Sequence, residues 1–302
     1  EKLIRISQLK LPITHTKAQL EKKIAKTLKN PGNSFTYEIR KQSLDCRHKN
    51  DKIFVYTVDV TIRDEQKLAK KVNNNNIMLT KEKPYEFPSP GETPLLHSPV
   101  IVGSGPAGLF CGWYLAKAGY CPIILERGEE AEKRQKTVEN FWKNGVLDPE
   151  SNVQFGEGGA GTFSDGKLNT LVKDPYGRNH EVLKRFVAAG APEEIIYQQK
   201  PHLGTDVLVG IVEKMRHEIE EMGGKFCFRS KVTDLIFENN TLKEIEINND
   251  KRIPAQVCVL APGHSARDTF EMLQKRGVYM EPKSFAVGLR IEHPQEMINM
   301  DL

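Results

Sequence analysis

Closely spaced cysteines are absent from this 302-residue sequence, and their absence excludes several kinds of site. The five cysteines are scattered, and no two of them form a Cys-x-x-Cys pair. A zinc ribbon and a dithiol redox pair both need such spacing, so we predict no metal site and no disulfide-reductase chemistry. An odd, scattered set of thiols favours a reduced cytoplasmic protein.

Long apolar runs are absent as well. The best candidate, residues 98–119, is interrupted by glycines, by Pro106 and by Lys117. A helix that crosses a membrane needs about 18 or more consecutive apolar residues, so no membrane span is predicted. The sequence also begins without the apolar stretch of a secretory signal, which agrees with a cytoplasmic location.

Positive and negative charges nearly balance over the whole chain, but they are unevenly distributed between its first part and the remainder. The formal net charge is +4, yet residues 1–90 hold 19 Lys and Arg against 10 Asp and Glu, and the remainder holds 25 against 30. The sign changes where prolines crowd the sequence, at Pro84, Pro88, Pro90, Pro94 and Pro99. Proline at this density disfavours helix and sheet, so residues 83–97 are predicted to link two domains.

Residues 1–82 alternate between strand and helix patterns. Apolar residues repeat every second position in the strands and every fourth in the first helix, which Thr16 can cap. The predicted elements are strand 3–7, helix 16–29, strand 35–41, strand 53–62, helix 64–72 and strand 77–80. This β-α-β-β-α-β order predicts a small α+β domain of the ferredoxin-like type.

After residue 98 the pattern becomes that of a parallel α/β unit. An apolar strand over 100–102 is followed by Gly-x-Gly-x-x-Gly over 103–108 and then by a helix. The glycine motif alone is a weak signal, but Glu126 stands at the end of the next apolar strand. This context predicts a βαβ unit that binds a dinucleotide.

Each residue of the motif is suited to a physical role. Gly103 permits a tight turn, Gly105 lets the backbone approach a diphosphate, and Gly108 lets the helix pack close to the strand. The free N–H groups and the dipole at the helix start favour an anion. Glu126 can accept hydrogen bonds from ribose hydroxyls and opposes a 2′-phosphate, so a nicotinamide dinucleotide phosphate is disfavoured. A glycine-rich turn without a ligand is the alternative.

A later segment of the sequence distinguishes an FAD-binding domain from a nicotinamide-binding one. Strand patterns over 226–228, 232–237 and 242–247, with intervening turns, predict a three-stranded antiparallel meander. The chain then returns to an apolar strand over 257–260. A plain nicotinamide-binding Rossmann domain continues with βαβ units instead, so the meander favours an FAD-binding domain, to which we assign residues 98–280.

Four stretches carry a closer resemblance to a known family: Arg40–Asp45, Asn152–Leu168, Gly204–Asp206 and Gly263–Asp268. The sequence is similar to flavoproteins of the glutathione-reductase type, and more closely resembles bacterial FAD-dependent dehydrogenases of unassigned substrate. The resemblance implies an α/β fold in which an FAD/NAD(P)-binding Rossmann-like domain with an antiparallel β-meander is preceded by a small α+β ferredoxin-like domain. It also implies FAD as the cofactor.

The resemblance further implies which residues of this chain contact FAD. The diphosphate would be held by the glycine motif, at Gly103, Gly105, Pro106, Ala107 and Gly108. Glu126 would hold the adenosine ribose, with Arg127 beside it. The backbone of Val232 would read adenine, and Ala261 and Gly263 would approach the cofactor at the end of their strand.

Two further contacts are implied downstream of the ribose-binding acid. Arg134 matches an arginine that reaches the phosphates or the ribitol, and a solvated helix face is the alternative. The glycine-rich loop over 156–166, with Gly158, Gly159 and Thr162, would approach the flavin ring or the diphosphate. The alternative for this loop is a mobile surface segment of no function.

A flavin performs hydride transfer itself, so no catalytic triad is expected and none can be identified. His202, His264 and His293 belong to the residue type suited to proton transfer, and His264, just after the Ala261-Pro262-Gly263 turn, is the best candidate. A structural histidine is the alternative. No second glycine motif is present, so NAD(P)H would bind only transiently, and the small-molecule substrate is not identified.

The closing elements of an FAD fold are not found after residue 263. Flavoproteins of the resembled type end with a strand and a Gly-Asp turn before a last helix. Here residues 285–291 predict instead the first strand of a substrate domain over 281–302. We therefore expect the sequence to be part of a longer protein.

Three alternative functions stay open. The basic first domain could bind RNA by stacking bases on Phe54 and Tyr56, although these residues share a strand face with Val58 and Val60 and no RNA-recognition signature is present. The chain could also be a nicotinamide-only dehydrogenase, or it could bind FAD without catalysis. We expect no membrane partner and no nucleic acid.

Overall fold

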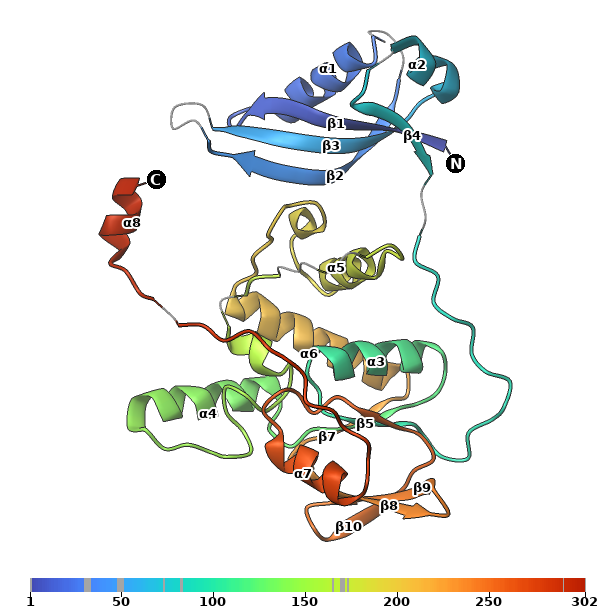
Figure 1. Ribbon diagram of the computed structural model, residues 1–302, viewed down its shortest axis with the longest axis vertical. Coiled ribbons are helices and arrows are strands. Elements are labelled where there is room, and N and C mark those ends of the chain that lie inside the picture. The colour runs from blue at the N-terminus through green and yellow to red at the C-terminus, as the bar shows by residue number, and fades with distance from the viewer. Residues whose placement is uncertain are drawn as a thin grey trace.

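The computed structural model describes residues 2–29, 34–47, 52–72, 74–81, 84–164, 166–168, 172, 174–289 and 291–301. Figure 1 shows two folded parts, which we call the front unit (residues 2–81) and the body (residues 98–280). Asp165 and Arg290, which belong to stretches singled out above, lie outside the described residues. No helix in the described part of the chain combines the length and apolar character needed to cross a membrane.

The front unit has the predicted order of elements. They are β1 (Lys2–Pro12), α1 (Lys17–Thr27), β2 (Thr36–Asp45), β3 (Ile53–Thr61), α2 (Glu65–Val72) and β4 (Ile77–Lys81). The strands form an antiparallel sheet in the order β2-β3-β1-β4. Thr16 caps α1 as predicted, because its hydroxyl accepts a hydrogen bond from the Gln19 amide and the Gln19 side chain accepts one from the Thr16 amide.

One face of the front-unit sheet packs against helix residues and buries the core. Ile4, Ile24 and Val58 are fully buried there. Tyr56 belongs to the same core, is 3% exposed, and its hydroxyl accepts a hydrogen bond from the Gln42 side chain at 2.6 Å. The suggestion that Tyr56 stacks on RNA bases is therefore wrong, since the ring is covered by packing.

The body is built on a four-stranded parallel sheet in the order β11-β5-β6-β7. Its strands are β5 (Val100–Val102), β6 (Ile123–Leu125), β7 (Lys225–Cys227) and β11 (Cys258–Leu260). The helices are α3 (Pro106–Lys117), α4 (Ala131–Asn144), α5 (Arg178–Ala188), α6 (Thr205–Glu221) and α7 (Arg267–Lys275), with 3-10 turns η1 (Ala160–Phe163) and η2 (Glu193–Ile196). Because side chains alternate along a strand, Ile101 packs toward α3 and α6, whereas Val100 and Val102 pack toward a second, smaller sheet.

That second sheet is the predicted antiparallel meander, but its strands differ from the prediction. It consists of β8 (Val232–Glu238), β9 (Thr241–Ile247) and β10 (Lys251–Pro254). Residues 226–228 are predicted as its first strand, but the strand that forms there, over 225–227, pairs in parallel with β6 instead. The physical reason is the preceding helix α6, because a strand that follows a crossover helix joins the parallel sheet.

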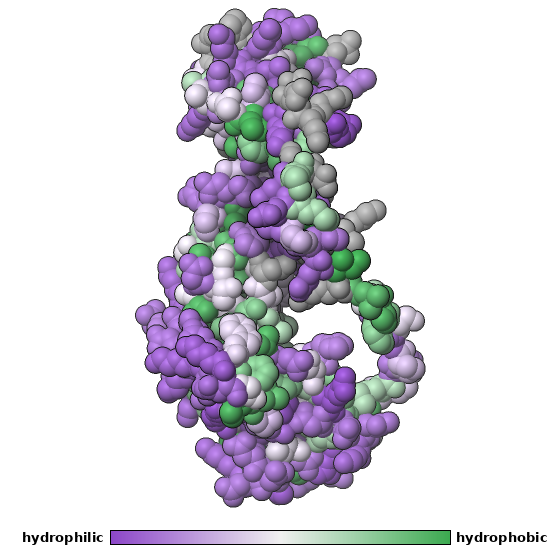
Figure 2. Space-filling view, turned by 90° about the vertical axis from the view of Figure 1, so that its left-hand side faces the viewer, coloured by the Kyte–Doolittle hydropathy of each residue, from purple (hydrophilic) through white to green (hydrophobic). Residues whose placement is uncertain are grey.

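The two parts are joined by the linker and by a short β-bridge. The described residues of the linker form no helix or strand, and in Figure 1 the linker runs along the outside of the body to β5. In the bridge, the Gln42 amide donates to the Tyr197 carbonyl at 2.7 Å and the Gln199 amide donates to the Gln42 carbonyl at 2.8 Å. Figure 2 shows that hydrophilic residues predominate on the face it presents, in keeping with a charged content of 28%.

The strand predicted over 285–291 is not formed by the described residues. Residues 281–289 contain neither helix nor strand, and Phe285, Val287 and Leu289 are 81%, 84% and 96% exposed. A strand is stabilised when a neighbour satisfies its amide and carbonyl groups, and no described strand pairs with this segment. The helix α8 (Gln295–Asp301) follows it.

Candidate functional site

A cavity of about 250 Å³ opens beside the carboxyl ends of β5, β6 and β11 and gathers most of the predicted cofactor residues. Its walls come from five segments, within 102–107, 125–127, 154–160, 230–232 and 261–269. The predicted residues that line it are Gly103, Gly105, Pro106, Ala107, Glu126, Arg127, Gly159, Val232, Ala261, Gly263 and His264. Gly108, Arg134, Gly158 and Thr162 are not part of its lining.

Packing requires the first and third glycines of the motif. Gly103 has a φ of +98°, and a Cβ placed there would overlap the carbonyl oxygen of Ala261 at the end of β11. A Cβ on Gly108 would overlap the carbonyl oxygen of Gly103. The roles predicted for these two residues, a tight turn and a close helix–strand contact, are thus confirmed.

Gly105 differs from both, because packing does not exclude a side chain at this position. The nearest atom to a Cβ placed on it is the Cα of Gly159, at 3.8 Å, and Gly105 lines the cavity. Gly105 is also the N-cap of α3 and provides no side-chain hydrogen bond to the first amides of the helix. Those amides and the helix dipole are suited to an anion in the cavity.

Glu126 lies 4% exposed at the end of β6, and four donors hold its carboxylate. Oε2 accepts from the Ser104 amide at 2.9 Å and from the Ser104 hydroxyl at 2.7 Å. Oε1 accepts from the amides of Gly128 at 2.9 Å and Gly156 at 3.0 Å. A carboxylate has about four lone-pair sites, so a ribose hydroxyl must replace one of these donors. Of the four, only the Ser104 hydroxyl can rotate away.

We expect Ser104→Ala to bind adenosine diphosphate about fivefold more tightly than the wild-type chain, since a hydrogen bond is worth on the order of 1 kcal/mol. The substitution frees one acceptor site on Glu126 and keeps the backbone amide in place. Isothermal titration of both proteins measures the change. Weaker binding by the variant would show that the serine hydroxyl supports the ligand instead of competing with it.

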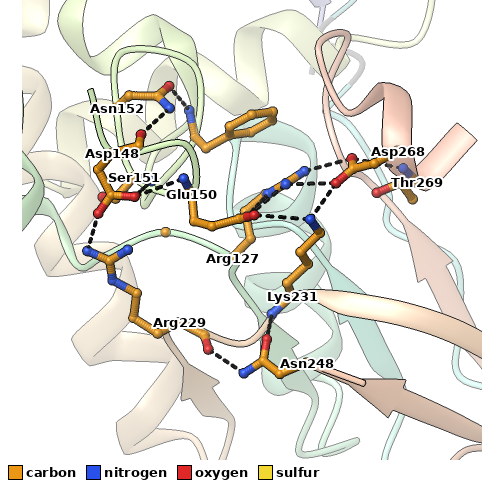
Figure 3. Close-up of polar contacts among 12 residues, drawn as sticks. Arg127, Asp148, Glu150, Ser151, Asn152, Arg229, Lys231, Asn248, Asp268 and Thr269 are labelled. Atoms are coloured by element: carbon orange, nitrogen blue, oxygen red, sulfur yellow. Dashed lines mark hydrogen bonds and ion pairs between the residues drawn. The ribbon is translucent and has the colours of Figure 1, made fainter. Parts of the chain in front are cut away.

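A charged network holds Arg127 beside the cavity (Figure 3). Its guanidinium donates to the two oxygens of Asp268, each at 2.9 Å, and to Glu150 at 2.7 Å. Lys231 binds the same carboxylates, at 3.0 Å for Glu150 and 2.6 Å for Asp268. The guanidinium carbon lies 4.1 Å from the centre of the Phe155 ring. The network thus joins the end of β6, the start of β8 and α7 at one rim of the cavity.

The network should weaken in acid. Burial raises the pKa of Asp268, but hydrogen bonds from Arg127 and Lys231 outweigh burial and leave the pKa well below its usual range. A lowered carboxyl pKa stabilises the fold above the unfolded-state value of about 3.9, and this stabilisation is lost as the pH falls through the folded-state value. Because Asp268 is half-exposed, we expect at most about 1 kcal/mol at pH 7.

Urea unfolding of the wild type and Asp268→Asn, at neutral pH and in steps below about pH 4, measures this effect. The wild type should be the more stable protein at neutral pH, and its advantage should shrink in acid. An advantage that grows in acid would contradict the lowered pKa.

Arg134 does not line the cavity. Its side chain is 0% exposed, and its guanidinium donates to backbone carbonyls between residues 152 and 159. The alternative of a solvated helix face is therefore wrong, and the predicted reach to phosphate or ribitol is replaced by bonds to this loop. Gly158 and Thr162 are also buried and are not among the lining residues, and the Thr162 hydroxyl has no hydrogen-bond partner among the described residues.

Sequence reasoning missed part of the cavity lining. Gly156 and Ala160 belong to the loop over 156–166 that was expected near the cofactor, and the missed residues are Val102, Leu125, Gln154, Phe155, Ser230, Lys231, Pro262, Ser265, Ala266 and Thr269. Ser230 and Lys231 could have been found, because they directly precede Val232 at the start of the meander. Gln154, Phe155 and Ser265 lie in loops whose course no periodic pattern predicts, and Thr269 lies in the first turn of α7. His264 lines the cavity and is exposed, whereas His202 and His293 are not among the lining residues.

The fold and the cavity together define a Rossmann-like α/β unit with a nucleotide-binding type of glycine turn. Residues 101–137 match the family model described as an NAD(P)-binding Rossmann-like domain. Residues 3–61 match a domain of unknown function, DUF8436. The chain is also 45% identical over 299 residues to an uncharacterized protein of Clostridium beijerinckii, covering 99% of this chain and 56% of that protein. It thus spans little more than half the length of this curated relative.

Solved structures also resemble the chain at low identity, and three of them serve as examples. Thermovibrio ammonificans THI4 has 23% identity and a TM-score of 0.39, over 60% of this chain and 63% of that chain. Lactococcus lactis thioredoxin reductase has 16% identity and a TM-score of 0.31, over 55% and 35%. The GidA-related protein from Thermus thermophilus has 12% identity and a TM-score of 0.32, over 56% and 54%. At these TM-scores the likenesses carry no argument about activity.

Proposed function

We propose that the body binds FAD in this cavity and that the protein is an FAD-dependent oxidoreductase, a dehydrogenase or reductase acting on a small molecule. The observation that carries the proposal is the setting of Gly105. No atom of the described residues forbids a side chain there, yet the residue is a glycine that faces a cavity at an uncapped helix start. A diphosphate held by the first amides of α3 accounts for that space.

The cavity lining supports an assignment of the other parts of the ligand. Glu126 would hold the adenosine ribose once the Ser104 hydroxyl rotates, Arg127 would stand beside it, and the backbone at Val232 would meet the adenine. The cavity of about 250 Å³ is below the 300–1,000 Å³ typical of a ligand pocket, so the described residues would enclose the adenosine and diphosphate and not the whole dinucleotide.

The meander favours FAD over a nicotinamide dinucleotide. Both the start of β8 and the turn after β11 line the cavity, and a domain of successive βαβ units would have no β8 there. When bound, FAD would supply the hydride transfer, and the residues of this chain would bind and orient it. NAD(P)H would then be a transient partner. The family model that matches residues 101–137 covers the glycine turn that both cofactors share.

We extend the proposal to the organisation of the chain. Residues 1–82 form a ferredoxin-like accessory domain, 83–97 a linker, 98–280 the FAD-binding domain and 281–302 the start of a substrate domain. The strand order of the front unit supports the first assignment.

The test is to purify the 302-residue chain, denature it and analyse any released cofactor by absorbance and chromatography. We expect FAD, or, if the chain is isolated without cofactor, tight binding of added FAD in titration and weaker binding of NAD and NADP. Binding of NAD without FAD would replace the proposal by a nicotinamide-only dehydrogenase. Binding of FAD that no electron donor or acceptor can reduce or reoxidise would leave a non-catalytic flavin-binding protein.

A further inference from the structure

Arg134 is a fully buried cation that the proposed cofactor contacts do not use. It lies in the first turn of α4 and is 0% exposed. Its guanidinium nitrogens donate to five backbone carbonyls, at distances between 2.6 and 3.3 Å, and the acceptors are those of Asn152, Val153, Gly156, Glu157 and Gly159. One side chain therefore fixes most of the loop over 152–159.

The charge of Arg134 is compensated inside the body. Burial lowers its pKa to about 10, and the nearby carboxylates of Glu126 and Glu157 oppose this lowering, so the side chain is charged at neutral pH. Glu157 is itself 0% exposed and accepts hydrogen bonds from the Ala131 amide at 2.7 Å and from Arg216 Nε at 2.8 Å. Removing Arg134 would leave the buried carboxylates of Glu126 and Glu157 with less positive charge near them, which is costly inside the body.

The loop that Arg134 holds is also a wall of the cavity. Gln154, Phe155, Gly156 and Gly159 line it. The Gly156 amide donates to Glu126 at 3.0 Å, and the Gly158 amide donates to the Ser104 carbonyl at 2.9 Å. These two hydrogen bonds therefore fix the loop over 152–159 and the carboxylate of Glu126 relative to each other.

The loop needs a glycine at the point where it crosses the Arg134 side chain. A Cβ placed on Gly156 would overlap Arg134 Cδ, and Gly156 has a φ of +120°. The backbone thus runs directly over the arginine side chain, and the carbonyls converge on the guanidinium without intervening side-chain atoms.

We propose that Arg134 is a positioning residue of the nucleotide site: it holds the loop over 152–159, and through the Gly156 amide holds Glu126, in the geometry that binds the adenosine ribose before any ligand arrives. This inference rests on the proposed function. It differs from a direct contact with the cofactor, because Arg134 would act through the loop.

The test compares Arg134→Ala and Arg134→Lys with a matched control, Val138→Ala, in the full 302-residue chain. Val138 is 1% exposed one turn further along α4, so its truncation loosens the same helix without touching the loop bonds. Adenosine diphosphate is the probe, since it carries the ribose and the diphosphate. Its affinity, the free energy of unfolding, and amide hydrogen exchange over 152–159 without ligand are measured for each protein.

We expect both Arg134 variants to bind adenosine diphosphate about 10- to 100-fold more weakly, as is typical when a residue that orients a ligand-binding group is lost. Amides of the loop should exchange faster in both, whereas Val138→Ala should change neither property beyond its loss of stability. Millimolar guanidinium chloride should restore part of the affinity of Arg134→Ala, and ammonium chloride should not. If Arg134→Ala does not fold, Arg134→Lys, which keeps the charge but not the fork of donors, decides the question.

The possible failures are distinguishable. If the Arg134 variants bind adenosine diphosphate weakly but their loop exchanges as in the wild type, Arg134 contacts the ligand directly and the inference is overturned. The inference is also overturned if the affinities of all three variants simply follow their free energies of unfolding. If the wild-type chain binds neither adenosine diphosphate nor FAD, the proposed function fails. Loop exchange then still decides whether Arg134 orders residues 152–159, and unchanged exchange rejects that role as well.

Discussion

Gly105→Val is expected to abolish FAD binding while leaving the free energy of unfolding within about 1 kcal/mol of the wild type, the usual size of a change at a helix N-cap. The nearest atom to the first carbon of the new side chain is 3.8 Å away, so the fold has room for it. That room belongs to the cavity at the start of α3. A valine would fill the space in which the diphosphate approaches the backbone.

The matched control is Gly210→Ala in α6. A Cβ at Gly210 meets nothing within 4 Å among the described residues, and the residue is exposed and outside the cavity lining, so the variant should retain FAD and be at least as stable as the wild type. Flavin content after gel filtration and urea unfolding of the three proteins measure both properties. FAD retained by Gly105→Val at the wild-type level would remove the glycine turn from the binding site.

Glu126→Ala is expected to weaken both FAD binding and the fold. Loss of hydrogen bonds to a charged group costs about 1.5–3 kcal/mol, which corresponds to roughly 10- to 150-fold in affinity. In addition, the amides of Ser104, Gly128 and Gly156 lose their acceptor in a buried setting. Each unsatisfied buried donor costs about 1–3 kcal/mol, so the free energy of unfolding should fall by several kcal/mol unless water enters.

Glu126→Gln separates the two effects, because the amide oxygen still accepts hydrogen bonds while the negative charge is lost. We expect the glutamine variant to lose less stability than the alanine variant. Titration with FAD and urea unfolding provide the two measurements. An alanine variant as stable as the wild type would show that these amides find other acceptors, and the loop would then not depend on Glu126.

The elements of the front unit could be predicted from sequence because their signals are local. The alternation around Val58 and the cap at Thr16 depend on neighbours within a few residues, and the structure contains these elements. The turn of Gly103 and the close approach at Gly108 are equally local, since they reflect backbone conformation and the contact between one strand and the next helix.

Other features depend on contacts between distant segments. Residues 225–227 have the pattern of any short apolar strand, and only the course of α6 over the parallel sheet decides that they pair with β6 and not with the meander. The segment 285–291 has a strand pattern too, but the pattern is not sufficient without a neighbour to pair with.

Residue type at fixed short spacing is enough to establish the α/β class of the body, the glycine turn at 103–108 and the acidic residue Glu126 at the end of the next strand. The contacts of Arg134 and Glu126, in contrast, depend on how distant segments of the body pack together. In the sequence, Arg134 stands among charged residues like a solvated helix face, yet the loop over 152–159 folds across it and supplies carbonyls that only a buried guanidinium can satisfy together. Glu126 likewise gains the Gly156 amide from 30 residues away. Burial and hydrogen-bond satisfaction are properties of the assembled chain, and no short-range pattern encodes them.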